Sequence, residues 1–142
     1  MRFVFILLLL LASCAPEGEP SSSISNPSEV NPEASRPYLV VLGIAQDGGA
    51  PQAGSHTDLR WNEPENSHMA TSLGLVDPET GKRWMFEATP DFRRQWYELD
   101  THAGLRTERV PDGIFLTHAH IGHYTGLMFL GHESVGAQGV PV

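Results

Sequence analysis

Three of the seven histidines in this 142-residue chain fall within six positions of one another, directly after a short apolar segment. Residues 113–117 (GIFLT) have the pattern of a short buried strand. Residues i and i+2 at a strand end point to the same side, so His118 and His120 can offer two imidazoles to one metal ion. His123 lies where the chain enters the next helix and could face the same pocket. This pattern favours a metal site, and the simpler alternative is a histidine cluster on the surface.

The other apolar segments predict a sheet. Residues 38–44 form a continuous apolar run rich in β-branched residues, which is typical of a strand buried on both faces. Residues 71–76 and 84–88 predict two further strands, and the turn-forming residues 77–82 between them predict a hairpin connection. The glycine- and proline-containing residues 46–54 predict a loop.

Two helices are expected after these strands. Thr89 has the pattern of an N-cap with Pro90 in the first helical position, and Gly104 is expected to end this helix. Residues 124–136 predict the second helix, and residues 140–142 look like the start of another strand. Strands followed by alternating strands and helices predict an α+β fold with helices outside a sheet. The first helix has one apolar stripe, formed by Phe92, Trp96 and Leu99.

The N-terminus has the pattern of a targeting signal. Arg2 precedes ten apolar residues, 3–12, which are too few to span a bilayer but match the apolar part of a signal peptide. The next residues, Ser13 and Cys14, complete a sequence (LASC) that resembles the lipobox of bacterial lipoproteins. The resemblance implies a signal peptide over residues 1–13 and a lipidated Cys14 that anchors the protein in the bilayer. The alternative is an ordinary secretory signal with an incidental cysteine.

Residues 14–37 are rich in proline, serine and glutamate and predict a flexible linker, which leaves residues 38–142 for the folded domain. Cys14 is the only cysteine, so the chain has no intrachain disulfide and no CxxC motif. Because Ala15 rather than Asp follows the lipidated residue, we expect attachment to the cell envelope, at the outer membrane facing the periplasm in a Gram-negative cell. The net charge of −8 argues against nucleic acid as a partner.

Three segments resemble one known family. Residues 117–127 (THAHIGHYTGL) are similar to the THxHxDHxxGL motif of the metallo-β-lactamase superfamily. Residues 86–93 (FEATPDFR) and 42–52 (LGIAQDGGAPQ) resemble the branch that contains the pyrroloquinoline quinone biosynthesis B proteins and the phosphoribosyl cyclic phosphodiesterases. The resemblance implies an αββα sandwich. Such domains have roughly 200 residues or more, so we expect residues 38–142 to form only the N-terminal half of one.

The resemblance also implies how the histidines are used. His118 and His120 belong to a first metal site and His123 to a second, but Gly122 stands where the motif has an aspartate that binds the second metal and orients the attacking water. We therefore expect one Zn²⁺ rather than two, with iron as an alternative. Asp47 is a candidate general base because it lies on a loop after a strand. A turn-capping role beside two glycines is the simpler interpretation of Asp47.

These observations predict a membrane-tethered, metal-dependent hydrolase. Its substrate would be a small molecule with an ester, lactone, amide or phosphodiester bond, while the 142-residue chain alone is expected to be inactive. One alternative is a metal-dependent oxygenase like those of quinone-cofactor biosynthesis. Another is a non-catalytic binding module that has lost its second metal site at Gly122. The sequence leaves the oligomeric state open.

Overall fold

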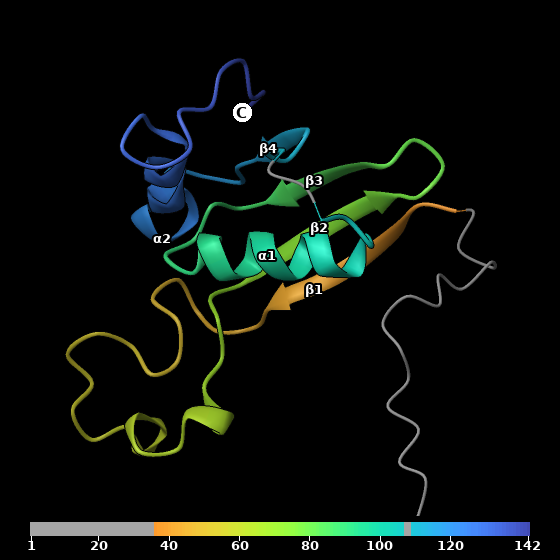
Figure 1. Ribbon diagram of the computed structural model, residues 1–142. Coiled ribbons are helices and arrows are strands. Elements are labelled where there is room, and N and C mark those ends of the chain that lie inside the picture. Colours follow the sequence, from red (N-terminus) through yellow and green to blue (C-terminus); the bar gives the residue numbers. More distant parts are fainter. Residues whose placement is uncertain (1–35, 107–108) are drawn as a thin grey trace, which may run out of the picture.

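The computed structural model describes residues 36–106 and 109–142 (Figure 1). The predicted signal peptide (1–13), Cys14 and most of the predicted linker lie outside the described residues. Among the residues that are described, no helix has the length and apolar character needed to cross a membrane.

Four strands form one sheet, in the order β1-β2-β3-β4. Neighbours β1 and β2 are antiparallel, as are β2 and β3, whereas β3 and β4 are parallel. Parallel neighbours need a crossover connection, and the helix α1 (Phe92–His102) lies within it (Figure 1). Four of the five predicted strands are therefore present, with shifted ends. They are β1 (Tyr38–Gly43), β2 (Ser72–Asp77), β3 (Lys82–Phe86) and β4 (Gly113–Phe115).

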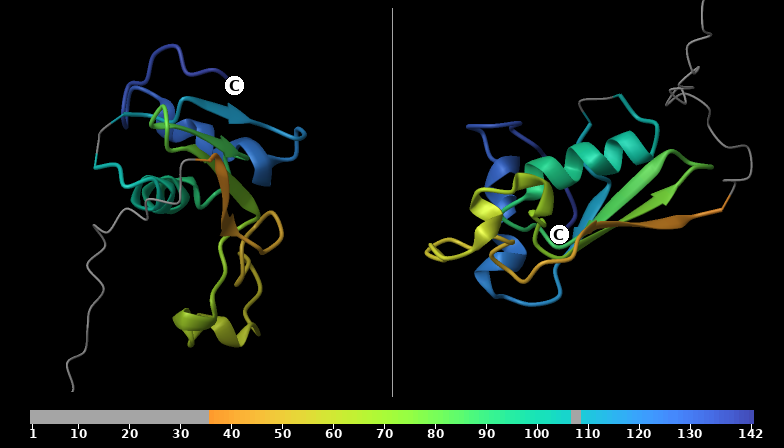
Figure 2. Two further views of the ribbon diagram at one scale, coloured as in Figure 1. Left: turned by 90° about the vertical axis from the view of Figure 1, so that its right-hand side faces the viewer. Right: turned by 90° about the horizontal axis from the view of Figure 1, so that it is seen from below.

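The core lies between the sheet and α1, which covers one face of the sheet (Figure 2). Alternate residues of the strands point into it. The prediction that residues 38–44 are buried on both faces is wrong. On the other face Leu39 and Val41 are 60% and 65% exposed, and Phe115 of β4 is 51% exposed, because no described layer covers that face. The buried apolar residues of the core are Val40, Leu42, Val76, Met85, Ala88, Phe92, Leu99 and Ile114.

The helix α1 begins later than predicted. Thr89 and Pro90 form a turn, and the N-cap is Asp91. The Thr89 hydroxyl accepts from the Asp91 N–H at 3.0 Å and donates to Oε1 of the buried Gln95 at 2.7 Å. The Asp91 carboxylate accepts from the Ala70 N–H at 2.8 Å, which ties the helix start to the segment entering β2. The helix ends at His102, and Gly104 follows with a φ of +66°, as its predicted stop role requires.

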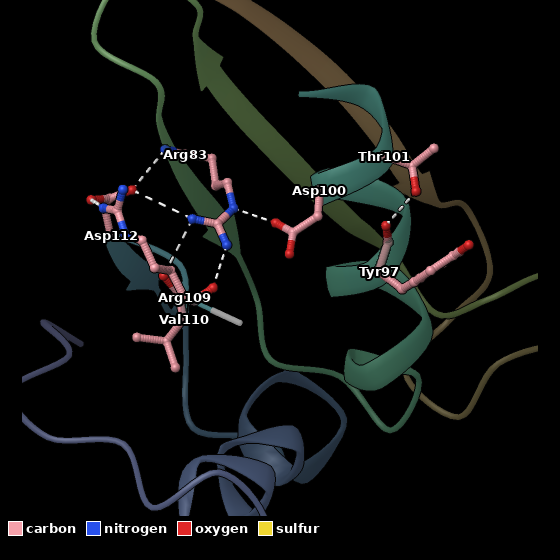
Figure 3. Close-up of polar contacts among 7 residues, drawn as sticks. All are labelled: Arg83, Tyr97, Asp100, Thr101, Arg109, Val110 and Asp112. Atoms are coloured by element: carbon pink, nitrogen blue, oxygen red, sulfur yellow. Dashed lines mark hydrogen bonds and ion pairs between the residues drawn. The ribbon is translucent and has the colours of Figure 1, made fainter. Parts of the chain in front are cut away.

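A buried arginine joins three parts of the fold (Figure 3). Arg83 of β3 is 0% exposed, and its Nε donates to the carboxylate of Asp100 on α1. Its two Nη atoms donate to the main-chain oxygens of Val110 and Arg109, before β4. The Asp112 carboxylate accepts from the Arg83 N–H at 3.0 Å. A charge can be buried here because each of the three guanidinium nitrogens donates to an oxygen.

The predicted second helix is wrong in extent. The chain forms one α-helical turn, α2 (Ile121–Tyr124), followed by a 3₁₀ segment, η3 (Thr125–Leu130). Backbone groups that would form hydrogen bonds within a longer helix form them with Ala88 instead. The Ala88 N–H donates to the His123 oxygen, and the Gly126 N–H donates to the Ala88 oxygen, both at 2.8 Å. The predicted strand at 140–142 is also absent, although the Ile114 N–H donates to the Pro141 oxygen at 2.9 Å.

Residues 46–68 extend away from the sheet between β1 and β2 (Figure 2). The segment is mostly loop, as predicted for residues 46–54, and contains two short 3₁₀ turns, η1 (Leu59–Trp61) and η2 (Pro64–Asn66). Its two ends are held together by an antiparallel bridge between Ala50 and His68.

Candidate metal centre

The three motif histidines lie together where β4 ends and α2 begins. His118 and His120 are on the extended segment after β4, and His123 is on α2. The hydrogen bonds of Ala88 to residues 123 and 126 hold α2 against the end of β3. Gly126 permits this close approach, because a Cβ there would lie 2.4 Å from Cβ of Phe92 and from the Thr89 oxygen.

His118 and His120 face each other. Nε2 of His118 is 3.0 Å from Nδ1 of His120, and their ring centroids are 4.7 Å apart. The other ring nitrogen of His118, Nδ1, is 2.9 Å from the Thr117 hydroxyl, which fixes the ring orientation. The centroid of His123 is 4.0 Å from that of His118. The structure thus brings the three imidazoles together, as their spacing predicts.

Glu87 is a site residue that the sequence analysis did not single out. Its side chain is buried, and its Oε1 accepts from the Thr117 N–H at 3.2 Å. Its Oε2 lies 3.2 Å from Nδ1 of His123, and these two buried atoms have no well-directed hydrogen bond among the described residues. Glu87 also has a φ of +75°, which costs a residue with a side chain about 1–2 kcal/mol. A signal was present in the sequence, since Glu87 is a carboxylate directly after an apolar strand.

Asp47 approaches the cluster from the opposite side of His123. Its Oδ1 lies 3.3 Å from Nε2 of His123, and its side chain is 54% exposed. The pKa of Asp47 is lowered, chiefly by the hydrogen bond from its own backbone N–H and further by the neighbouring His123 and His120, against an opposing effect of desolvation. A carboxylate with a lowered pKa is a weaker proton acceptor, and the general-base role of Asp47 stays a prediction. The local turn is closed by the main chain, with the Gly49 N–H donating to the Gln46 oxygen at 2.7 Å.

The side-chain donor atoms form two pairs, and the spacing within each pair is close to that of two ligands of one metal ion. Tetrahedral zinc, with ligands at 2.0–2.2 Å, separates two ligand atoms by about 3.4 Å. The nitrogen pair of His118 and His120 is 3.0 Å apart, and the His123–Asp47 pair is 3.3 Å apart. In the part of the chain that the structure describes, no three His, Cys, Asp or Glu side chains converge on one point. The pairs therefore supply two donors each, and a complete zinc shell needs additional ligands.

An open, shallow pocket lies beside the histidines. Its volume is about 400 Å³, and His118 forms one side of it. The rest of the lining is mainly apolar, so the pocket suits an uncharged part of a small molecule. These lining residues are Leu116, Ala119, Tyr124 and Leu127.

Comparisons with known proteins place this geometry in context. No protein-family model matches the chain. The chain is 34% identical over 97 residues to coenzyme PQQ synthesis protein B of Xanthomonas euvesicatoria, a match that covers 63% of this chain. It spans about a third (32%) of the length of that relative.

Two solved structures have a similar fold. One is Zn²⁺-bound PqqB from Methylobacterium extorquens, with a TM-score of 0.53 and 25% identity over 66% of this chain and 36% of that one. The other is a diphosphatase of the PhnP family, with a TM-score of 0.50 and 27% identity over 67% of this chain and 34% of that one. The first of these proteins binds zinc, the ion that the histidine motif predicts.

Proposed function

We propose that this chain, which has the metallo-β-lactamase fold and resembles the PqqB branch of that superfamily, carries metal ligands of a metal-dependent hydrolase. The proposal rests on one observation above the others. Nε2 of His118 and Nδ1 of His120 face each other at 3.0 Å, at the end of a strand and beside an open pocket. The similarity to a zinc-bound protein supports zinc as the ion.

Each residue of the site has a definable task in this function. His118 and His120 would hold the ion, and the Thr117 hydroxyl keeps the His118 ring in its orientation. Glu87 lies against Nδ1 of His123 at 3.2 Å, and Nε2 of His123 lies 3.3 Å from Oδ1 of Asp47. When bound, zinc supplies Lewis acidity and lowers the pKa of a water molecule towards 7, which is the chemistry that hydrolysis requires.

The pocket beside His118 limits the chemical classes of substrate that would bind. Its mainly apolar wall would bind the uncharged part of a small ester, lactone or amide. A phosphodiester is the fourth candidate, and the similarity to a diphosphatase supports a phosphorus centre. Hydrolysis assays with one model ester, lactone, amide and phosphodiester, each with added Zn²⁺, would distinguish these substrate classes.

Metal analysis tests the proposal directly. We expect the chain purified in the presence of zinc to retain the ion, and the His118→Ala/His120→Ala double variant to lose it, as measured by mass spectrometry of the metal content. The matched control is His56→Ala/His132→Ala, which removes two exposed histidines outside the cluster. Unchanged zinc content in the first double variant would show that the proposal is wrong.

The similarity to a coenzyme PQQ synthesis protein favours a second candidate, a metal-dependent oxygenase. Imidazole and carboxylate groups, which this site combines, also bind non-haem iron. Oxygen consumption that depends on added Fe²⁺ would support this candidate. Hydrolysis by a zinc-loaded protein with no oxygen consumption would support the first.

We also propose that Cys14 is lipidated and tethers the domain to the cell envelope. The support is the sequence alone, in which an apolar segment of signal-peptide length ends in LASC. Two or more acyl chains anchor a protein stably where one does not. Replacement of Cys14 by Ser should move the protein from the membrane fraction to the soluble fraction, with loss of labelling by a fatty acid. Retention in the membrane without labelling would contradict the proposal.

A further inference from the structure

We propose that Asp47 supplies, from the loop after β1, the carboxylate that the histidine motif lacks at Gly122, and that Asp47 and His123 form a donor pair for a divalent cation. This inference rests on the proposed metal-dependent function and extends it to a second pair of ligands. It also explains why the motif position is a glycine.

The first argument is steric. Gly122 is buried, and a Cβ built on it would lie 2.3 Å from Cβ, 2.7 Å from the oxygen and 2.8 Å from Cα of Asp47. All three of the nearest atoms belong to Asp47. Real Cβ atoms do not approach backbone atoms this closely, so no side chain fits at position 122 while Asp47 keeps its place. The loop at Asp47 therefore occupies the space that a side chain at position 122 would need.

The second argument is the position of the loop, which is set by main-chain bonds. The Ile44 and Ala45 N–H groups both donate to the Met69 oxygen at 3.0 Å. The Ala45 oxygen accepts from both the N–H and the hydroxyl of Thr71. These bonds fix the loop two residues before Asp47, and the turn bond from Gly49 to Gln46 encloses it. These main-chain bonds place the backbone of Asp47 beside His123.

The third argument is electrostatic. Two carboxylates facing one imidazole attract a positive charge. Oε2 of the buried Glu87 lies 3.2 Å from Nδ1 of His123. On the other side of the ring, Nε2 of His123 lies 3.3 Å from Oδ1 of Asp47. The separation is close to the roughly 3.4 Å between two ligand atoms of a tetrahedral zinc ion. A divalent cation thus satisfies both the charge and the spacing.

Calorimetric titration with Zn²⁺ tests this proposal, with three variants of the chain. Asp47→Asn removes the charge and keeps the shape, and we expect it to weaken zinc binding at least about tenfold. Asp58→Asn is the matched control on the same segment, because Asp58 pairs with Arg60 and not with a histidine. Gly122→Ala should weaken binding as Asp47→Asn does, because it displaces the Asp47 loop.

The outcomes separate this inference from the proposed function. If Asp47→Asn binds zinc as the wild type does, a proton alone joins Asp47 to His123 and the inference is overturned while the function stands. If His118→Ala/His120→Ala still binds zinc and the further change Asp47→Asn removes that binding, the inference stands and the function assigned to His118 and His120 falls. Asp47→Asn is nearly isosteric, so a folding failure of Gly122→Ala would not prevent the decision.

Discussion

Arg83 donates through Nε to the carboxylate of Asp100, so the sheet and the last turn of α1 are joined by an ion pair with no solvent at the guanidinium. We expect Arg83→Met to lower the free energy of unfolding by about 3–5 kcal/mol, because it leaves Asp100 and two main-chain oxygens without their donor. Urea unfolding followed by circular dichroism measures this change. The control is Arg94→Met on the exposed side of α1, whose solvent-screened ion pair with Glu98 contributes little to stability. Equal, small losses in both variants would contradict this account of Arg83.

Glu87 combines a buried carboxylate with a positive φ, and two substitutions separate these properties. Glu87→Ala and Glu87→Gly both remove the carboxylate, but only glycine removes the backbone strain. We expect the glycine variant to be more stable than the alanine variant by about 1 kcal/mol, the reverse of the usual order. Urea unfolding of the two variants measures this difference. An alanine variant as stable as the glycine variant would show that the strain at residue 87 is negligible.

Both Glu87 variants should also bind Zn²⁺ about 10–100-fold more weakly than the wild type, because His123 loses the group that orients its ring. Calorimetric titration measures this loss, and Glu133→Ala, a change at an exposed glutamate, is the control. Wild-type affinity for Zn²⁺ in both Glu87 variants would show that Glu87 is not part of the metal centre.

Asp58 gives a pH-dependent contribution to stability. Its pKa is lowered from the ordinary 3.8, first by the side-chain hydrogen bonds from Arg60 and then by the Arg60 backbone N–H. A carboxyl with a lowered folded-state pKa stabilises the protein above its ordinary pKa and loses this effect as the pH falls through the lowered value. We expect the stability difference between wild type and Asp58→Asn to shrink as the pH falls below about 5. Thermal unfolding across this range measures it, and a constant difference would contradict the expectation.

The strands were predictable because local chemistry determines them. Apolar runs and the turn residues of the β2–β3 connection gave all four strands to within a few residues, and Gly104 marked the end of α1. The spacing of His118 and His120 predicted that their rings would meet. These features depend on neighbours in sequence, which periodicity and turn chemistry describe.

The predictions fail where contacts between residues far apart in the sequence determine the structure. The helix expected over residues 124–136 is replaced by short turns because Ala88, far away in the sequence, takes the hydrogen bonds of His123 and Gly126. The start of α1 moves because Ala70 binds the side chains of Asp91 and Gln95. Glu87 and Asp47 meet His123 only through the fold. No local pattern contains such contacts.

The two main-chain hydrogen bonds of Ala88 have a consequence for how the molecule opens. They connect α2 to the end of β3 through main-chain atoms alone, so substitutions on the surface of α2 leave these hydrogen bonds intact. When α2 opens by local unfolding, the edge strand β4 must therefore separate from β3 as well. The amide hydrogens of Ala88 and Gly126 should exchange with deuterium as slowly as those between β3 and β4. The exchange rates of these two amides would therefore report whether α2 and the β3–β4 pair are intact.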